Sequence, residues 1–176
     1  MTLKHRLEAI EADISLLAYD AIVNAANAPL QMGGGVDGAI RRKAGIEMEN
    51  DLRKIGRCAP GDAIITKGYR LAAKYVIHTV APMWNSGHSE SQKDELLTSC
   101  YRNAMRLASE NSLSTIAFPA IGTGIYGWPP DRASQIAFST ISSHLRTRDL
   151  PERVIFCCFS RADLDRYHAL INGLED

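Results

Sequence analysis

Two runs set the pattern of this chain: Asp20-Ala21-Ile22-Val23-Asn24-Ala25-Ala26-Asn27 and, after five further residues, Gly33-Gly34-Gly35-Val36-Asp37-Gly38-Ala39-Ile40. Residues 20–25 are mostly apolar with β-branched side chains at their centre, which predicts a strand. Residues 37–55 carry apolar side chains at helical spacing, which predicts a helix. A strand, a glycine loop and a helix in this order are typical of an α/β protein.

The same order occurs again further along the chain. Residues 115–118 predict a strand, residues 122–127 form a second glycine loop, and residues 131–145 predict a helix after two prolines. The other predicted strands are residues 63–66, 75–80 and 153–159, with 5–10 as an edge strand, and the other predicted helices are residues 91–111 and 162–174. Near-continuous apolar strands are typical of a sheet covered on both faces. We therefore predict a three-layer α/β/α sandwich with a mixed central sheet, whose ligand binds beyond the carboxyl ends of the strands.

Length and charge narrow the classes of function. The 176 residues fall within the usual size of one domain, and 20 Lys plus Arg balance 20 Asp plus Glu. A chain without excess positive charge is a poor candidate for binding nucleic acid. Charges throughout the first twenty residues leave no apolar core for a signal peptide, and no later run is long enough to span a membrane. We therefore expect a cytoplasmic protein.

The cysteines give no sign of metal or redox chemistry. Positions 58, 100, 157 and 158 lack the paired spacing of a zinc site or a redox dithiol. Two of them lie in the apolar run 154–159, where a free cysteine packs as a small apolar side chain. We expect reduced thiols, and neither a metal nor a cofactor.

Both glycine loops are suited to an anion. Without a Cβ, the backbone of residues 33–35 can approach a ligand closely, and its N–H groups can converge on a phosphate next to a helix N-terminus. Either loop alone could instead be a flexible turn, but two such loops at one sheet edge predict cradles for a diphosphate. Neither loop is followed by the lysine of a Walker A motif. Both loops have glycines at G-x-G-x-x-G spacing, but neither has the distant acidic partner on a second strand that a Rossmann dinucleotide site uses. An NTPase and a Rossmann dehydrogenase are therefore disfavoured.

Asp37 is the one carboxylate amid the first glycine cluster, where a phosphate would repel it. We therefore predict that it orients or deprotonates a water, or holds a ribose hydroxyl; the alternative is a helix-capping or first-turn aspartate. Pairing with Arg41, four residues on, would weaken Asp37 as a base. Asn27 is predicted to contact sugar hydroxyls, and Asn24 to close an Asx turn at the strand end. His78 lies in an apolar strand and is predicted to be a hydrogen-bonded core residue.

Several of these motifs together resemble one family. Residues 24–27, residues 33–40, the run Tyr75-Val76-Ile77-His78-Thr79-Val80 and residues 122–127 strongly resemble macrodomains of the MacroD type, which include bacterial O-acetyl-ADP-ribose deacetylases. The resemblance covers nearly the whole chain, so residues 1–176 are expected to form a single macrodomain. It implies a site for ADP-ribose without a metal.

The resemblance also implies roles for individual residues. Asp13 would bind the adenine amino group with Ile14 alongside, and Phe159 would stack on adenine. Asn27 and Asp37 would address the distal ribose and the reacting ester. The residues that would wrap the diphosphate are Gly33, Gly34, Gly35, Val36, Gly122, Thr123, Gly124, Ile125 and Tyr126, the last also as part of a lid.

Three positions depart from the family's usual sequence. Ala12-Asp13-Ile14-Ser15 stands where Gly-Asp-Ile-Thr is frequent, a change that keeps the carboxylate and a hydroxyl. Gly122 replaces a frequent serine, which removes a hydroxyl but keeps the backbone. Arg41 replaces a frequent histidine, and this change is expected to affect the rate of turnover more than binding.

The expected function is hydrolysis of an ester on the distal ribose. The substrates would be O-acetyl-ADP-ribose, other O-acyl esters of ADP-ribose, or proteins that carry mono-ADP-ribose on acidic side chains; Asp37 and the loop N–H groups would orient the ester. The alternative is a reader module that binds ADP-ribose without turnover, with Asp37 bonded only to a hydroxyl. A third interpretation, an RNA-binding α/β domain, lacks the expected basic stripe.

Overall fold

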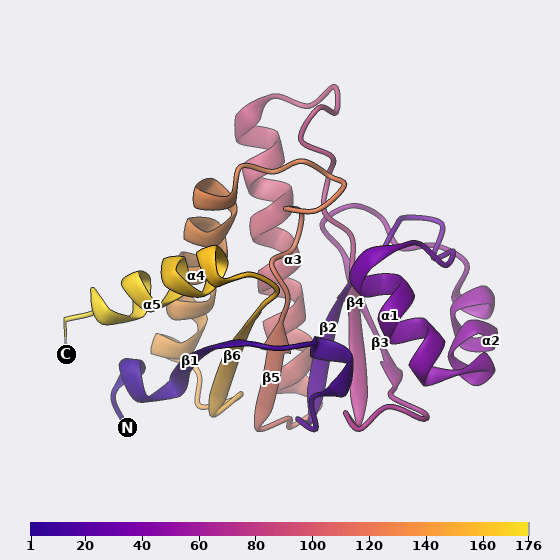
Figure 1. Ribbon diagram of the computed structural model, residues 1–176, viewed down its shortest axis with the longest axis horizontal. Helices are drawn as coiled ribbons and strands as arrows, with labels where there is room; N and C mark the ends of the chain where they lie inside the picture. Colours follow the sequence, from indigo (N-terminus) through magenta and orange to yellow (C-terminus); the bar gives the residue numbers. More distant parts are fainter. Residues whose placement is uncertain (176) are drawn as a thin grey trace.

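The computed structural model describes residues 1–175 and contains a six-stranded mixed sheet (Figure 1). The strands are β1 (Leu7–Glu11), β2 (Ala21–Ala25), β3 (Ala63–Lys67), β4 (Tyr75–Thr79), β5 (Thr115–Phe118) and β6 (Arg153–Cys158). Their order across the sheet is β1-β6-β5-β2-β4-β3, and every neighbouring pair is parallel except β3 with β4. The single antiparallel edge makes the sheet mixed, as predicted.

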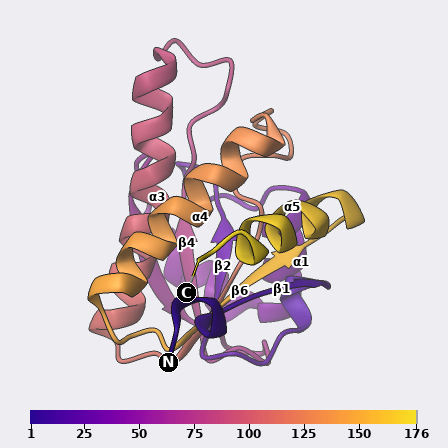
Figure 2. The same ribbon diagram turned by 90° about the vertical axis from the view of Figure 1, so that its left-hand side faces the viewer.

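Helices cover both faces of the sheet. They are α1 (Gly35–Ala44), α2 (Ile46–Ile55), α3 (Glu90–Glu110), α4 (Pro130–Thr147) and α5 (Arg161–Asn172), with short 3-10 turns at Leu3–Arg6 and Ile14–Leu16. In Figure 1, α1 and α2 lie beside the β4 and β3 end of the sheet, and α4 and α5 beside the β1 and β6 end. Figure 2 shows α4 crossing in front of the strands between α3 and α5. The three-layer α/β/α prediction is confirmed.

The strands supply apolar side chains to two cores, one on each face. Alternate residues of neighbouring strands, such as Val23 and Ile77, pack toward α3, α4 and α5. The residues next to them, such as Ile22 and Val76, pack toward α1 and α2. Because successive side chains of a strand point to opposite faces, a strand buried on both sides must be apolar throughout. This requirement explains the near-continuous hydrophobic runs in the sequence.

One helix prediction is wrong. Residues 37–55 were expected to form one helix, but the chain breaks between α1 and α2 at Gly45, whose φ is +92°. That backbone conformation favours glycine and does not continue a right-handed helix. The apolar spacing conceals the break, because Ile40 and Ala44 of α1 and Met48 and Leu52 of α2 are all buried in the same core.

The topology gathers the chain segments that follow β1, β6, β5 and β2 at one edge of the sheet, because these four neighbouring strands are parallel. In open α/β sheets this carboxyl edge is where ligands bind.

Within residues 1–175, no helix is both long and apolar enough to cross a bilayer.

Candidate functional site

The carboxyl edge of the sheet carries every segment that the sequence singles out. Asp13 follows β1, Phe159 follows β6, residues 122–127 follow β5, and residues 26–34 follow β2. Neighbouring strands lie about 4.8 Å apart, so the four strand ends span about 14 Å. The edge is therefore suited to an elongated ligand that contacts all four segments.

The first glycine loop leads into an open helix N-terminus. Gly34 is the N-cap of α1 and supplies no side chain to the cap, while Gly35 begins the helix with a φ of +55°. The first N–H groups of a helix have no helical acceptor, and together they favour an anion. A Cβ on Gly34 or Gly35 would meet no atom of the protein within 4 Å. The backbone here is thus accessible to a ligand, as the sequence predicts for a phosphate cradle.

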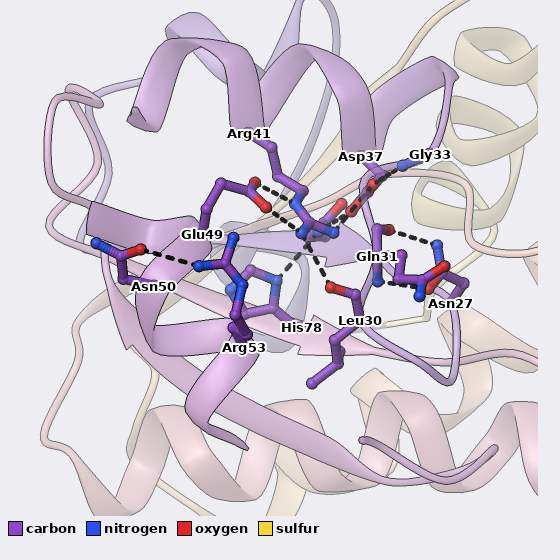
Figure 3. A network of polar contacts seen from close by, with 11 residues as sticks. Asn27, Leu30, Gln31, Gly33, Asp37, Arg41, Glu49, Asn50, Arg53 and His78 are labelled. Carbon is purple, nitrogen blue, oxygen red and sulfur yellow. Dashed lines mark hydrogen bonds and ion pairs between the residues drawn. The ribbon is translucent and has the colours of Figure 1, made fainter. Parts of the chain in front are cut away.

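Asp37 is held by two hydrogen-bond donors and one ion-pair partner rather than left free in the loop. Its side chain is buried, and Oδ1 accepts a hydrogen bond from Asn24 Nδ2 at 2.7 Å. Oδ2 accepts the Gly33 N–H at 2.6 Å and lies 3.5 Å from Arg41 Nη1 (Figure 3). The expected pairing with Arg41 is therefore present. The amide of Gly33 is engaged by Asp37, which leaves Gly34, Gly35 and Val36 as the members of the predicted cradle in the first loop.

Asn24 has a larger part in the site than the sequence suggested. It does not close an Asx turn but lies fully buried within β2, where Nδ2 donates to Asp37 Oδ1 and to Nδ1 of His78 at 3.1 Å. Since Nδ1 accepts, the ring proton is on Nε2, which donates to Thr66 Oγ1 at 2.9 Å. His78 is a hydrogen-bonded core residue, as predicted, and it orients the amide that holds Asp37. The signal in the sequence for this role was a polar residue, Asn24 or His78, inside each of two apolar strands, and the two residues lie opposite each other in the sheet.

The buried histidine gives a prediction for stability against pH. Burial lowers the pKa of His78 to about 3, and the charge of Arg41 acts in the same direction. The unfolded chain takes up this proton near pH 6.5, so between about pH 6.5 and about pH 3 the unfolded state binds more protons than the folded state. The free energy of unfolding should therefore fall by about 1.4 kcal/mol per pH unit from this group as the solution is acidified. Above pH ~6.5 the group adds no slope.

Urea unfolding of the wild type and of a His78→Asn variant, between about pH 5 and about pH 7, measures this contribution. Asn keeps an acceptor near the position of Nδ1 but cannot be protonated. The stability difference between the two proteins should narrow on acidification. A difference that is constant with pH would show that His78 is not the titrating group.

Asn27 lies next to Asp37 but is itself bonded within the loop. Its Nδ2 donates to the Gln31 carbonyl at 2.7 Å, and its Oδ1 accepts the Gln31 N–H at 2.9 Å (Figure 3). A Cβ placed on Gly33 would be 3.6 Å from Asn27 Nδ2 and 3.4 Å from Asp37 Oδ2. The two residues predicted to act on the ester therefore converge on one point beside the glycine loop.

The second glycine loop packs tightly on an aromatic side chain. Gly122 has a φ of +87°, and a Cβ there would lie 2.7 Å from Cδ1 of Trp128. The indole is fixed because its Nε1 donates to the Pro82 carbonyl. A serine at this position would be strained by the backbone conformation and would collide with the indole. The departure from serine thus follows from the packing of this loop.

The tip of the second loop carries two side chains that differ in exposure. Ile125 is 91% exposed, whereas Tyr126 is partly buried. Burial raises the pKa of Tyr126, and the negative charge of Asp37 raises it further. The hydroxyl of Thr123 is occupied, since it donates to the Ala120 carbonyl. The charge of Asp37 thus reaches Tyr126 of the second loop, while the Ile125 side chain is open to solvent.

The opposite end of the edge carries a partly exposed carboxylate and an exposed aromatic ring. The Asp13 side chain is 48% exposed, and Oδ1 accepts hydrogen bonds from the Ser15 hydroxyl and N–H, while Lys43 Nζ lies 3.3 Å from Oδ2. The Ser15 hydroxyl is the main cause of a lowered pKa for Asp13. Phe159 is 88% exposed and can stack on a planar ring. Ile14 is buried in the core and its carbonyl accepts the Leu17 N–H, so its side chain does not face a ligand at this edge.

The cysteines are all buried and free. Burial raises the pKa of Cys58, Cys100 and Cys157 to about 11, which keeps these thiols protonated and unreactive at neutral pH. Within the described part of the chain, His, Cys, Asp and Glu side chains do not gather in groups of three or more that could hold a metal ion.

Known proteins share this sequence and fold. Residues 23–137 match the family described as the Macro domain. A macro domain-containing protein of Chlorobaculum tepidum is 55% identical over 162 residues, 92% of each chain. A protein of Salmonella newport named O-acetyl-ADP-ribose deacetylase is 47% identical over 175 residues, 97% of each chain. The crystal structure of a Trypanosoma brucei macrodomain in complex with ADP-ribose superposes with a TM-score of 0.87 at 35% identity and covers 94% of this chain and 69% of the other.

The family match includes both glycine loops, and the strand order brings these loops to one edge of the sheet. The relatives are similar over nearly their whole length as well as over this chain. The chain belongs to the macrodomain family.

Proposed function

We propose that this chain binds ADP-ribose along the carboxyl edge of the sheet and hydrolyses an ester carried on the distal ribose. The observation that carries the proposal is the convergence of Asn27 and Asp37 on Gly33, beside the open N-terminus of α1. A phosphate held at that helix end would bring the attached ribose next to an amide and a carboxylate. The proposed substrates are O-acetyl-ADP-ribose and proteins that carry mono-ADP-ribose on acidic side chains.

The rest of the ligand would follow the strand order. Adenine would lie at the β1 and β6 end, stacked on Phe159 with its amino group on Asp13. The diphosphate would lie between the first loop and the second, contacting the N–H groups of Gly34, Gly35 and Val36. The T. brucei macrodomain, which has the same fold, was crystallised with ADP-ribose, and this supports the assignment of the ligand.

Asp37 would act mainly by orienting a water. Its two oxygens already accept from Asn24 and Gly33, and Arg41 lies close to one of them, so few lone pairs of the carboxylate remain free for a ligand or a water. A carboxylate fixed in this way can still accept one hydrogen bond from a water and aim it at the ester carbonyl. A phosphate oxygen of the ligand would assist by accepting the proton. Both substrates present an ester on the distal ribose, so we propose that one arrangement serves both.

A reader module remains the second candidate, and one observation favours it. Asn27 and Asp37 both have their polar atoms engaged by the protein before any ligand binds. Such residues could hold ADP-ribose without activating water. The relative named O-acetyl-ADP-ribose deacetylase, 47% identical over 97% of this chain, supports the enzyme over the reader.

The experiment that separates the two candidates measures binding and turnover on the same preparation. ADP-ribose binding is titrated by calorimetry, and initial rates are measured with O-acetyl-ADP-ribose and with a protein mono-ADP-ribosylated on glutamate. The enzyme predicts saturable binding and hydrolysis of at least one ester well above the rate in buffer. Saturable binding with both esters decaying at the buffer rate would establish the reader instead.

A further inference from the structure

Arg41 and Glu49 form a largely buried ion pair that joins α1 to α2. Arg41 Nε donates to Glu49 Oε1 and Nη2 donates to Glu49 Oε2, both at 2.6 Å. The Arg41 side chain is 2% exposed and that of Glu49 is 19% exposed. A two-point contact between guanidinium and carboxylate fixes both distance and orientation, and shielding from water strengthens it.

The break at Gly45 makes this pair possible. In one continuous helix, residues eight apart are separated by about 12 Å along the axis, too far for side chains in direct contact. The φ of +92° at Gly45 turns α2 back so that Glu49 meets Arg41. The feature that overturned the helix prediction therefore also sets the position of the guanidinium.

The Arg41 guanidinium also contacts two segments next to the proposed reaction site (Figure 3). Nη1 lies 3.5 Å from Asp37 Oδ2, and Nη2 donates to the Leu30 carbonyl at 2.9 Å. Leu30 has a φ of +55°, a conformation that residues with side chains rarely adopt without support. It lies in the turn that Asn27 closes by bonding Gln31. The Arg41 guanidinium thus contacts both the Asp37 carboxylate and the turn that includes Asn27.

On the basis of the proposed function, we propose that Arg41, anchored by Glu49, is a positioning residue that holds Asn27 and Asp37 in register for the reaction. Arg41 touches neither the reacting ester nor the water, and acts through the two residues that do. A histidine, which the family often carries here, has two ring nitrogens and could not make these four contacts at once. Arginine at this position is therefore a different means of support and does not imply a defective site.

The test replaces both partners, Arg41→Met with Glu49→Met, because an apolar pair of similar volume preserves folding better than a lone buried charge. Hydrogen exchange is followed at the Gln31 and Gly33 amides, which Asn27 and Asp37 accept. We expect exchange at both amides to quicken by about tenfold or more while the melting temperature changes little. The kcat for ester hydrolysis should fall by about 10- to 100-fold with KM nearly unchanged.

Two further proteins keep the test decisive. Glu49→Gln retains the shape of the anchor but not its charge, and should show a smaller effect in the same direction. Replacing the exposed Arg106 and Glu110 pair of α3 with Met should change neither quantity. Unchanged amide exchange in the Arg41 and Glu49 variant, or quickened exchange with an unchanged kcat, would overturn the inference. If the wild type does not hydrolyse the ester, the proposed function fails, while amide exchange still decides whether Arg41 positions the two residues.

Discussion

An Asp37→Asn variant should lose about 100- to 1000-fold in kcat for hydrolysis of O-acetyl-ADP-ribose, the largest effect that we expect from a single substitution. Asn has the same size but no charge, and one of its two ends is a donor. That donor must face either Asn24 Nδ2 or the Gly33 N–H, both of which now donate to the carboxylate. The side chain at position 37 would therefore lose both its charge and its fixed orientation. Initial rates at saturating substrate measure the change, and calorimetry with ADP-ribose shows whether binding is retained.

Asp131 provides a matched control for this substitution. It also lies in the first turn of a helix, α4, but its side chain is 85% exposed. Asp131→Asn should leave kcat at the wild-type value. A kcat for Asp37→Asn equal to that of the control would remove Asp37 from the reaction.

The second large effect is expected from Gly38→Ala. A Cβ on Gly38 would lie 2.6 Å from the Gly33 carbonyl oxygen and 2.8 Å from Arg42 Nη1. The arginine can move, but the carbonyl belongs to the first glycine loop, which must shift away from α1. A displacement of this loop of about 1 Å is enough to cost on the order of 100-fold in the chemical step. We expect weaker ADP-ribose binding, by calorimetry, and slower hydrolysis together.

The sign of the stability change makes the Gly38 test sharper. In an unconstrained helix, replacing Gly by Ala stabilises by up to about 1 kcal/mol. At Gly38 the collision should instead lower the melting temperature. Gly87→Ala is the control, because a Cβ there meets no atom within 4 Å and the residue lies in an exposed loop. Wild-type binding and a raised melting temperature in Gly38→Ala would mean that the loop does not pack on α1 as described.

Local signals were enough to predict most of the fold. The strand Thr115–Phe118 has the predicted bounds, because its apolar run ends at a proline and a glycine loop. The pairing of the two glycine loops was also predictable, since both follow parallel strands that meet at one edge. The break at Gly45 was not predictable, because the apolar spacing continues across it and the residues on both sides are buried in the same core.

The support of the site could not be predicted, because it depends on contacts between segments far apart in the sequence. The position of Asn24 at the end of a strand indicated an Asx turn. In the structure it lies opposite His78 in the neighbouring strand and donates hydrogen bonds to both His78 and Asp37. Glu49 gave the signal of an ordinary helix-surface residue. Its contact with Arg41 depends on the angle between α1 and α2, which the residue pattern does not encode.

The most direct test of the proposed function is single-turnover hydrolysis of O-acetyl-ADP-ribose, with the protein in excess over the ester and acetate release followed in time. Excess protein removes product release from the measurement and reports the chemical step alone. We predict a single exponential at least about 100-fold faster than decay in buffer, and its near loss in Asp37→Asn. An ester that is bound by the protein yet decays at the buffer rate would contradict the account.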